Sequence, residues 1–455
     1  MTIGNAAHVA IVGAGFSGTL QAINLLRHGG PRATLIERRD DHLARGVAYS
    51  ACHPLHLLNV RAANMSALPD DPDHFVRWLA ARGAGGAGSF ASRAVYGSYL
   101  AELLDAARQA GGDRLTIVRG EATDLVEDGQ GVRIGLADGG RIDADAAVLA
   151  LGNLPPHAPP GLAVERLPQD VYAGDPWASD IADGLGDGDR VLLLGTGLTA
   201  IDAALLLDTR GFGGTMIALS RRGLVPRPHR PAARRAPERL ERPPAMLSRL
   251  VADVRGRAET LGWRDAVDEL RPMTQAMWQA AGAAERGRFL RHLRPYWDVH
   301  RHRLAPEVAG RIDALRGAGR LRFIAGKTQA VTAAGDGAAL DWRPRGGSAT
   351  ERMPVRRIVN CTGPQGDLLR STESLLVNLL AAGRIRADVL RLGLDVDSQS
   401  RAVDGGGRVS DRLFAIGPMT RGGYWEIVAV PGLRMQTWAL ARRFANAHWV
   451  GGEGL

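Results

Sequence analysis

Residues 8–37 read HVAIVGAGFSGTLQAINLLRHGGPRATLIE, and this stretch decides the fold. The apolar run from Val9 to Val12 is typical of a strand buried on both faces. Three glycines follow in the spacing G-x-G-x-x-G, then a helical pattern and a second strand. Such glycines permit a tight turn, a close approach of the backbone to a pyrophosphate, and close helix–strand packing. The stretch therefore predicts a Rossmann-like β–α–β unit that binds a dinucleotide.

The second strand of this unit ends in an acid. Glu37 lies 24 residues after Gly13, about where a carboxylate accepts hydrogen bonds from ribose hydroxyls. An acid at this position repels a 2′-phosphate, so the unit suits an adenosine ribose without one. A glycine turn in a fold that binds no nucleotide is the alternative interpretation.

The same pattern recurs in residues 190–222, which begin RVLLLGTGLTAIDAALLLD. Gly195, Gly197 and Ala200 take the three glycine positions, and the fingerprint permits alanine at the third. Where the first unit has an acid, this one has Ser220, Arg221 and Arg222. A hydroxyl and two arginines hold a 2′-phosphate by charge-assisted hydrogen bonds, which predicts NADPH. The alternative is a solvated basic turn.

Two further stretches indicate how the units are joined. DAAVLALG at 145–152 is a strand that ends in glycine, and VNCTGP at 359–364 has the same form. Both fit crossings between domains. The predicted fold class is α/β, with two three-layer Rossmann-like domains, the NADPH domain inserted in a discontinuous FAD domain, and a helical segment. The expected boundaries are 1–160 and 351–455 for the FAD domain and 161–350 for the NAD(P)H domain.

A helical pattern fills residues 246–319, within an insertion expected at about 225–320. It contains His292, His300 and His302 without the acids or cysteines that would complete a metal site, so we expect no metal. Core packing and a cap over a substrate pocket are both consistent with this segment.

Composition narrows the class of protein. The chain has 455 residues, a net charge of +9 and 45% apolar residues, which is ordinary for a globular protein with two or three domains. Cys52 and Cys361 form no C-x-x-C pair, so we expect no thiol relay and a reducing, cytoplasmic location. No stretch is apolar enough to span a membrane, and no nucleic-acid-binding motif accompanies the positive charge.

Longer stretches resemble a known family over essentially the whole chain. They are GVAYS at 46–50, HLLNV at 56–60, MSALPDDPDHFVRWL at 65–79, YGSYL at 96–100, DVHRHRLAP at 298–306 and GPMTRGGYWEIVAVPGLRMQ at 417–436. Together with the two dinucleotide units, they resemble the two-dinucleotide-binding-domain flavoproteins. The chain is most similar to the bacterial FAD/NAD(P)-binding family of the YdhS type, which is related to class B flavin monooxygenases and N-hydroxylating monooxygenases.

The resemblance implies that FAD lies on the first unit, completed by the last segment, and that NADPH docks on the second. The residues expected to bind FAD are Gly13, Gly15, Phe16, Ser17, Gly18, Glu37, Arg38, Asn59, Met65, Ser66, Gly152, Gly417 and Pro418. Those expected to bind NADPH are Gly195, Gly197, Leu198, Thr199, Ala200, Ser220, Arg221 and Arg222. Pro418 stands where many such flavoproteins have an aspartate for the ribityl chain, so that contact must come from elsewhere.

FAD and NADPH in one chain imply hydride transfer to flavin N5 as the first half-reaction. We expect a monooxygenase-type oxidoreductase that uses O2 on a small organic substrate. VYAGDPWAS at 171–179 lacks the histidine of the Baeyer–Villiger motif, which favours N- or S-hydroxylation. A reductase or dehydrogenase without oxygenation, or a non-catalytic flavin/NADPH sensor, remains an alternative.

Four residues are candidates for catalysis, and each also has a structural interpretation. His53 and His56 follow the first unit, where a histidine could shuttle protons near neutral pH or simply hold the loop by hydrogen bonds. Trp425 and Glu426 lie in the last segment, where they could shape the pocket or only pack and cap. The sequence indicates neither the substrate nor the oligomeric state.

Overall fold

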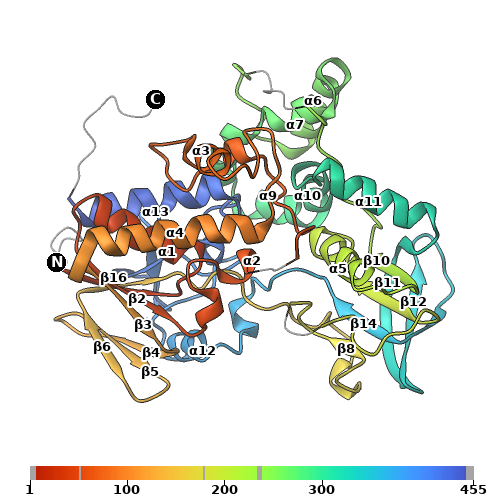
Figure 1. Ribbon diagram of the computed structural model, residues 1–455, viewed down its shortest axis with the longest axis horizontal. Coiled ribbons are helices and arrows are strands. Elements are labelled where there is room, and N and C mark those ends of the chain that lie inside the picture. The colour runs from red at the N-terminus through yellow and green to blue at the C-terminus, as the bar shows by residue number, and fades with distance from the viewer. Residues whose placement is uncertain (1–6, 51–52, 178–179, 233–237, 447–455) are drawn as a thin grey trace.

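A computed structural model describes residues 7–50, 53–177, 180–232 and 238–446. The chain forms two α/β units, at the left and right of Figure 1, with further helices above them. This arrangement confirms the predicted fold class.

Within the described residues, the first sheet has six strands in the order β15-β16-β7-β1-β2-β3. All neighbours are parallel except β15 and β16, which are antiparallel. The strands are β1 (His8–Val12), β2 (Arg32–Glu37), β3 (Leu115–Arg119), β7 (Ala146–Leu149), β15 (Arg401–Val403) and β16 (Val409–Ala415).

Alternate residues of β1 face two different cores. Val9 and Ile11 pack against the layer of α1, α4 and α13, whereas Ala10 and Val12 pack on the side of α12 and a small antiparallel sheet (Figure 1). The elements of these layers are α1 (Phe16–Arg27), α4 (Arg93–Gly111), α13 (Val430–Phe444), α12 (Ser374–Ala381), β4 (Ala122–Glu127), β5 (Val132–Leu136) and β6 (Arg141–Ala144). Two short helices, α2 (Gly46–Tyr49) and α3 (His74–Ala80), follow β2.

The second sheet has seven strands within the described part of the chain, in the order β13-β12-β11-β10-β9-β14-β8. They are β8 (Tyr172–Ala173), β9 (Arg190–Leu194), β10 (Thr215–Ser220), β11 (Leu321–Ala334), β12 (Gly337–Pro344), β13 (Glu351–Val355) and β14 (Arg357–Asn360). On one face, Val191 and Leu193 pack against α5 (Leu198–Thr209) and α11 (Pro306–Gly317).

The boundary between the second unit and the end of the first lies later than expected. β14 pairs in parallel with β9, with Ile358 opposite Leu192, and β13 pairs with β12. The boundary expected at residue 350 therefore falls inside the second sheet, because the strand that carries Asn360 completes that sheet before the chain returns to the first one.

Among the described residues between β10 and α11, five α-helices form what we call the helical insertion, residues 247–301. They are α6 (Leu247–Leu261), α7 (Trp263–Asp268), α8 (Thr274–Ala280), α9 (Ala283–Arg288) and α10 (Arg294–Arg301). In Figure 1, α6 and α7 lie at the top with α9 and α10 below them, and α11 leads back to the second sheet. Among the described residues, no helix is long and apolar enough to cross a membrane.

Candidate functional site

The first glycine turn has the backbone that its sequence predicts. Gly13 has φ +97°, and a Cβ there would lie 2.6 Å from the Ala150 carbonyl oxygen. A Cβ on Gly18 would overlap the Gly13 carbonyl oxygen. No side chain caps the start of α1, and its first turn contains no acid. The first N–H groups and the positive end of the helix dipole therefore suit the pyrophosphate of a dinucleotide.

The loop after β2 lies against this turn. Gly46 has φ +56°, and a Cβ on it would come within 3.1 Å of the Gly15 Cα. Ala44 donates a backbone hydrogen bond of 2.8 Å to the Ala14 carbonyl. The GVAYS stretch that resembles the flavoprotein family thus lies against the glycine turn, with the Gly46 backbone beside Gly15 and the Tyr49 ring 5.9 Å from the Phe16 ring.

Glu37 lies at the end of β2 with its carboxylate turned toward the glycine turn. It is buried, and its Oε2 accepts a 2.8 Å hydrogen bond from the Ala14 N–H. Its Oε1 accepts one of 3.1 Å from the Arg39 N–H. The neighbouring Arg38 instead pairs with Glu373, and the hydrogen bond to this carboxylate raises the pKa of Arg38. Glu37 is therefore fixed beside the turn, where a ribose hydroxyl is expected.

The last segment returns to the same place. Gly417 has φ +82°, and a Cβ on it would lie 2.7 Å from the Ser17 Oγ. Its N–H donates a 2.8 Å hydrogen bond to the Gln436 Oε1 on α13. Gly417 and Ser17, which the sequence analysis assigned to FAD from opposite ends of the chain, thus lie next to each other.

Met65 and Ser66 are buried in the first unit, and Asn59 lies at its edge. The Ser66 hydroxyl donates to the Asp71 carbonyl at 2.6 Å, and the Ser66 carbonyl accepts from Arg434 of α13 at 2.9 Å. The Asn59 carbonyl accepts a 2.9 Å hydrogen bond from the His229 Nε2. These contacts hold the 59–66 loop in place, and the assignment of these residues to FAD stays a prediction.

The second glycine turn repeats the first. Gly195 has φ +129°, and a Cβ on it would overlap the Cys361 carbonyl oxygen. Gly197 has open space beside it, and no side chain caps α5, which starts at Leu198 and Thr199 and carries no acid in its first turn. This backbone also suits a phosphate group.

Ser220 and the two arginines lie at the end of β10. The Ser220 Oγ is 2.9 Å from the Thr196 Oγ1 and accepts a 3.0 Å hydrogen bond from the Gly223 N–H. Arg221 is exposed, and within the described residues nothing pairs with its guanidinium. Arg222 lies over the Tyr296 ring, 5.3 Å from its centroid, which brings α10 of the helical insertion to this turn.

The two candidate histidines lie at the contact between the units. The His56 Nε2 is 3.1 Å from the Asp202 carbonyl oxygen on α5, and its ring meets the Trp177 ring edge-on at 5.5 Å. His53 packs against His56 at 4.9 Å. Burial lowers the pKa of His56. This placement favours their structural interpretation, because the His56 ring contacts the second unit and the His53 ring packs against His56.

Trp425 and Glu426 meet the helical insertion. Trp425 stacks on Trp278 at 4.7 Å. Glu426 accepts a 3.1 Å hydrogen bond from the Trp297 Nε1 and forms a 3.0 Å ion pair with Arg301. The insertion therefore covers the segment that follows Pro418, which agrees with a cap. Sequence reasoning missed Trp278 and Arg301 because scattered aromatic residues are equally typical of core packing.

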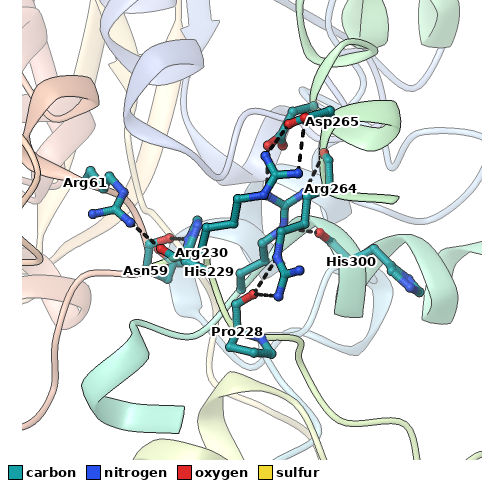
Figure 2. A network of polar contacts seen from close by, with 10 residues as sticks. Asn59, Arg61, Pro228, His229, Arg230, Arg264, Asp265 and His300 are labelled. Carbon is teal, nitrogen blue, oxygen red and sulfur yellow. Dashed lines mark hydrogen bonds and ion pairs between the residues drawn. The ribbon is translucent and has the colours of Figure 1, made fainter. Parts of the chain in front are cut away.

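A polar network, which we call the latch, joins the first unit to the second (Figure 2). Arg61 donates a 3.1 Å hydrogen bond to the Pro231 carbonyl, and His229 donates one to the Asn59 carbonyl. Arg230 then forms two hydrogen bonds, of 2.6 and 3.1 Å, to the Asp265 carboxylate on α7. The latch ties the 59–61 loop to the start of the helical insertion.

Of the two cysteines, one lies in the described part of the chain. Cys361 is buried, and burial raises the pKa of its thiol. Cys52 lies outside the described residues, as do the last two residues of the 171–179 stretch. No group of three or more histidine, cysteine, aspartate or glutamate residues is placed to hold a metal ion among those described.

The α/β fold expected from the sequence is confirmed, and solved structures of FAD-containing enzymes share it. Residues 10–154 match the family model described as FAD-NAD(P)-binding. No curated protein matches the chain in sequence.

Solved structures with the same fold cover nearly the whole chain. An ornithine N-hydroxylase from Kutzneria sp. 744 aligns over 96% of this chain and 99% of its own, with a TM-score of 0.65 at 15% identity. L-lysine 6-monooxygenase from Pseudomonas syringae aligns over 97% and 99%, with a TM-score of 0.65 at 17% identity. Thioredoxin reductase from T. acidophilum aligns over 97% and 99%, with a TM-score of 0.53 at 12% identity.

Replacing the middle glycine of each turn by alanine tests the two cofactor-binding sites separately. Gly15 and Gly197 both have backbone angles that alanine adopts, and an added Cβ meets nothing closer than 3.4 Å. We expect Gly15→Ala to weaken FAD binding at least tenfold, because a methyl group blocks the pyrophosphate. Gly197→Ala should retain FAD and weaken NADPH binding to a similar degree. Isothermal titration calorimetry measures both affinities.

The control for these variants is Gly129→Ala, which also has open space around its Cβ. All three proteins should unfold at the wild-type temperature when free of cofactor. Loss of both cofactors in either turn variant would contradict the separate assignment of the two turns.

The latch histidine should make stability depend on pH. Burial lowers the pKa of His229 to about 4, whereas an unfolded histidine titrates near 6.5. Because the unfolded chain binds this proton first, stability is complete above pH 6.5 and falls as the pH drops toward 4. As the pH drops from 6.5 toward 4, we expect the unfolding temperature of His229→Gln to fall less steeply than that of the wild type. Exposed His292→Gln is the control, and parallel curves for wild type and His229→Gln would refute the prediction.

Proposed function

We propose that the protein is an FAD-dependent, NADPH-using oxidoreductase of the monooxygenase type, acting with O2 on a small organic substrate. N- or S-hydroxylation is favoured over Baeyer–Villiger oxygenation. When bound, FAD would take two electrons from NADPH and pass them to O2. The chain supplies the two binding turns, the cap and the walls of the pocket.

The observation that carries this proposal is that one chain contains two glycine turns with residues of opposite charge beside them. The first turn has the Glu37 carboxylate beside it and receives Gly417 from the last segment. The second has Ser220 and the exposed Arg221 at the corresponding position. A carboxylate binds ribose hydroxyls and repels a 2′-phosphate, whereas arginine attracts one. FAD is therefore assigned to the first turn and NADPH to the second.

The structural neighbours support the choice of chemistry. The Kutzneria enzyme is an ornithine N-hydroxylase whose structure contains reduced FAD, NADP+ and L-ornithine, and the Pseudomonas syringae enzyme is named a lysine monooxygenase. The thioredoxin reductase has a lower TM-score, and Cys361 is buried without a neighbouring cysteine among the described residues. N-hydroxylation is accordingly preferred to a thiol relay.

The helical insertion provides what an oxygenating site needs. It covers Trp425 and Glu426 through Trp278 and Trp297, so the segment after Pro418 is shielded from water. Exclusion of water strengthens the electrostatic interactions in a site and prevents side reactions of reduced cofactors.

The test measures the bound cofactor, the reduction of the flavin by NADPH and the formation of an oxygenated product. The purified protein should carry FAD, and NADPH should bleach its flavin absorbance in the absence of oxygen. Oxygen and a panel of amines and sulfides should then yield a product heavier by one oxygen atom in mass spectrometry. Bleaching without an oxygenated product for any panel member would favour a reductase or dehydrogenase. A protein without affinity for FAD would refute the proposed enzymatic function.

The arginines after β10 should set the preference for NADPH. We expect Arg221→Gln to weaken binding of 2′,5′-ADP roughly tenfold or more and to leave 5′-AMP unchanged, because a charge-assisted hydrogen bond is lost. Arg222→Gln should have a similar effect, and the exposed Arg227→Gln is the control. Calorimetry with the FAD-loaded protein measures these affinities. Equal losses for both nucleotides would refute the assignment.

A further inference from the structure

A cavity of about 230 Å³ lies where the main segments of the two units meet. Residues of the segments 152–154, 362–368, 391–393 and 418–428 line it, Asp367 and Glu426 excepted, and Arg294 of the helical insertion also lines it. Gly152 and Pro418, both expected to contact FAD, belong to this wall. The cavity therefore adjoins the proposed flavin site and has room for a small organic molecule.

The lining of this cavity is cationic. It includes three arginines, Arg294, Arg391 and Arg421, and none of the described residues that line it is acidic. Arg391 is at the edge, with its side chain 62% exposed and 3.4 Å from Asp367. Arg294 is paired with Asp298 at 3.3 Å.

Arg421 is the arginine without a partner. Its Nε is buried without a hydrogen bond, and its side chain has no ion pair within the described residues. The guanidinium lies over the Trp425 ring, 4.3 Å from its centroid. The two acids that act on its charge form ion pairs with other arginines, Asp298 with Arg294 and Glu426 with Arg301, although Asp298 Oδ1 is buried without a hydrogen bond.

Arg421 stays charged at neutral pH. Burial lowers the pKa of this arginine to about 10, Arg294 lowers it further, and Asp298 and Glu426 act in the opposite direction. A charge withdrawn from water without a partner is costly in a folded protein. An anion inside the cavity would offset this cost, and the planar guanidinium can hold a carboxylate by two parallel hydrogen bonds.

Contacts on both sides of Arg421 fix its position. The carbonyls of Gly422 and Gly423 accept hydrogen bonds from Trp278 and Gln275 of the helical insertion, at 2.8 and 3.0 Å. On the other side, the Leu394 N–H donates a 2.7 Å hydrogen bond to the Met419 carbonyl. The wall is therefore preorganised, which lowers the entropic cost of binding a ligand.

We propose that this cavity binds the carboxylate of the substrate and that Arg421 is its anion-binding residue. This inference rests on the proposed function and names its substrate class: a small organic acid or amino acid rather than a neutral compound or a simple amine. An anionic group of FAD is the other source of the same chemistry, and the experiment separates the two.

The experiment uses the FAD-loaded protein and two matched pairs of probes. Succinate is compared with uncharged succinamide, and L-lysine with cadaverine, which lacks its carboxylate. Binding is followed by the flavin absorbance and by the unfolding temperature. In the wild type, at least one carboxylate should bind tenfold or more tightly than its matched compound, and Arg421→Gln should abolish this difference.

Three further variants test how far the preference for carboxylates depends on Arg421. Arg421→Lys keeps the charge but not the planar fork, so it should retain part of the preference. Arg391→Gln should lose less than Arg421→Gln, because Arg391 is exposed and paired with Asp367. Arg443→Gln, on the exposed face of α13, should bind as the wild type does.

Several results would overturn the proposal. One is equal binding of each carboxylate and its matched compound in the wild type. Another is an Arg421→Gln protein that loses FAD but keeps the preference for carboxylates, which would assign Arg421 to the cofactor. A third is a fall of several degrees in the unfolding temperature of this variant without probe, because an unpaired charge should not stabilise the fold.

Failure of the proposed function would look different. A protein that prefers carboxylates through Arg421 but does not oxidise NADPH would uphold this site and refute the enzyme. A protein that oxidises NADPH and oxygenates amines without preferring carboxylates would refute this site alone.

Discussion

The pairing of β16 with β7 holds the first unit together, and the site depends on it. Leu413 lies opposite Ala147 although the second unit and the helical insertion separate them in the sequence. Because these strands are parallel neighbours, the segment after β16 emerges at the same edge of the sheet as the β1 glycine turn. This edge brings Gly417 against Ser17. The long insertion is tolerated because loop-closure entropy grows slowly with length.

The fold was predictable from the sequence because its signals are local and repeated. The two β–α–β units form where the sequence predicts them, and the first glycine of each turn, Gly13 or Gly195, has a positive φ that favours glycine. The boundary near residue 350 was less predictable. β14 resembles β7 in sequence, since both are short apolar strands before a glycine, and only pairing with β9 shows which sheet it completes.

The candidate site was predictable to a smaller degree. The glycine positions and Glu37 could be recognised from their spacing in the sequence, although their roles in binding cofactors stay predictions. Contacts between distant segments carry no such spacing: the stacking of Trp278 on Trp425 joins residues 147 positions apart, and His56 reaches Asp202 across the two units. Resemblance suggested that the loop of His56 faces the flavin, whereas burial against α5 explains this histidine by packing.

The distribution of charge, like the contacts between distant segments, is known only from the structure. A net charge of +9 states that cations are in excess but not where they act. Many arginines are neutralised locally, as Arg38 is by Glu373 and Arg230 by Asp265. Paired arginines stabilise loops and leave little field for a ligand. Arg421 differs because its side chain forms no ion pair within the described residues and lines a cavity. The location of an unpaired cation, rather than the number of cations, therefore indicates where an anion can bind.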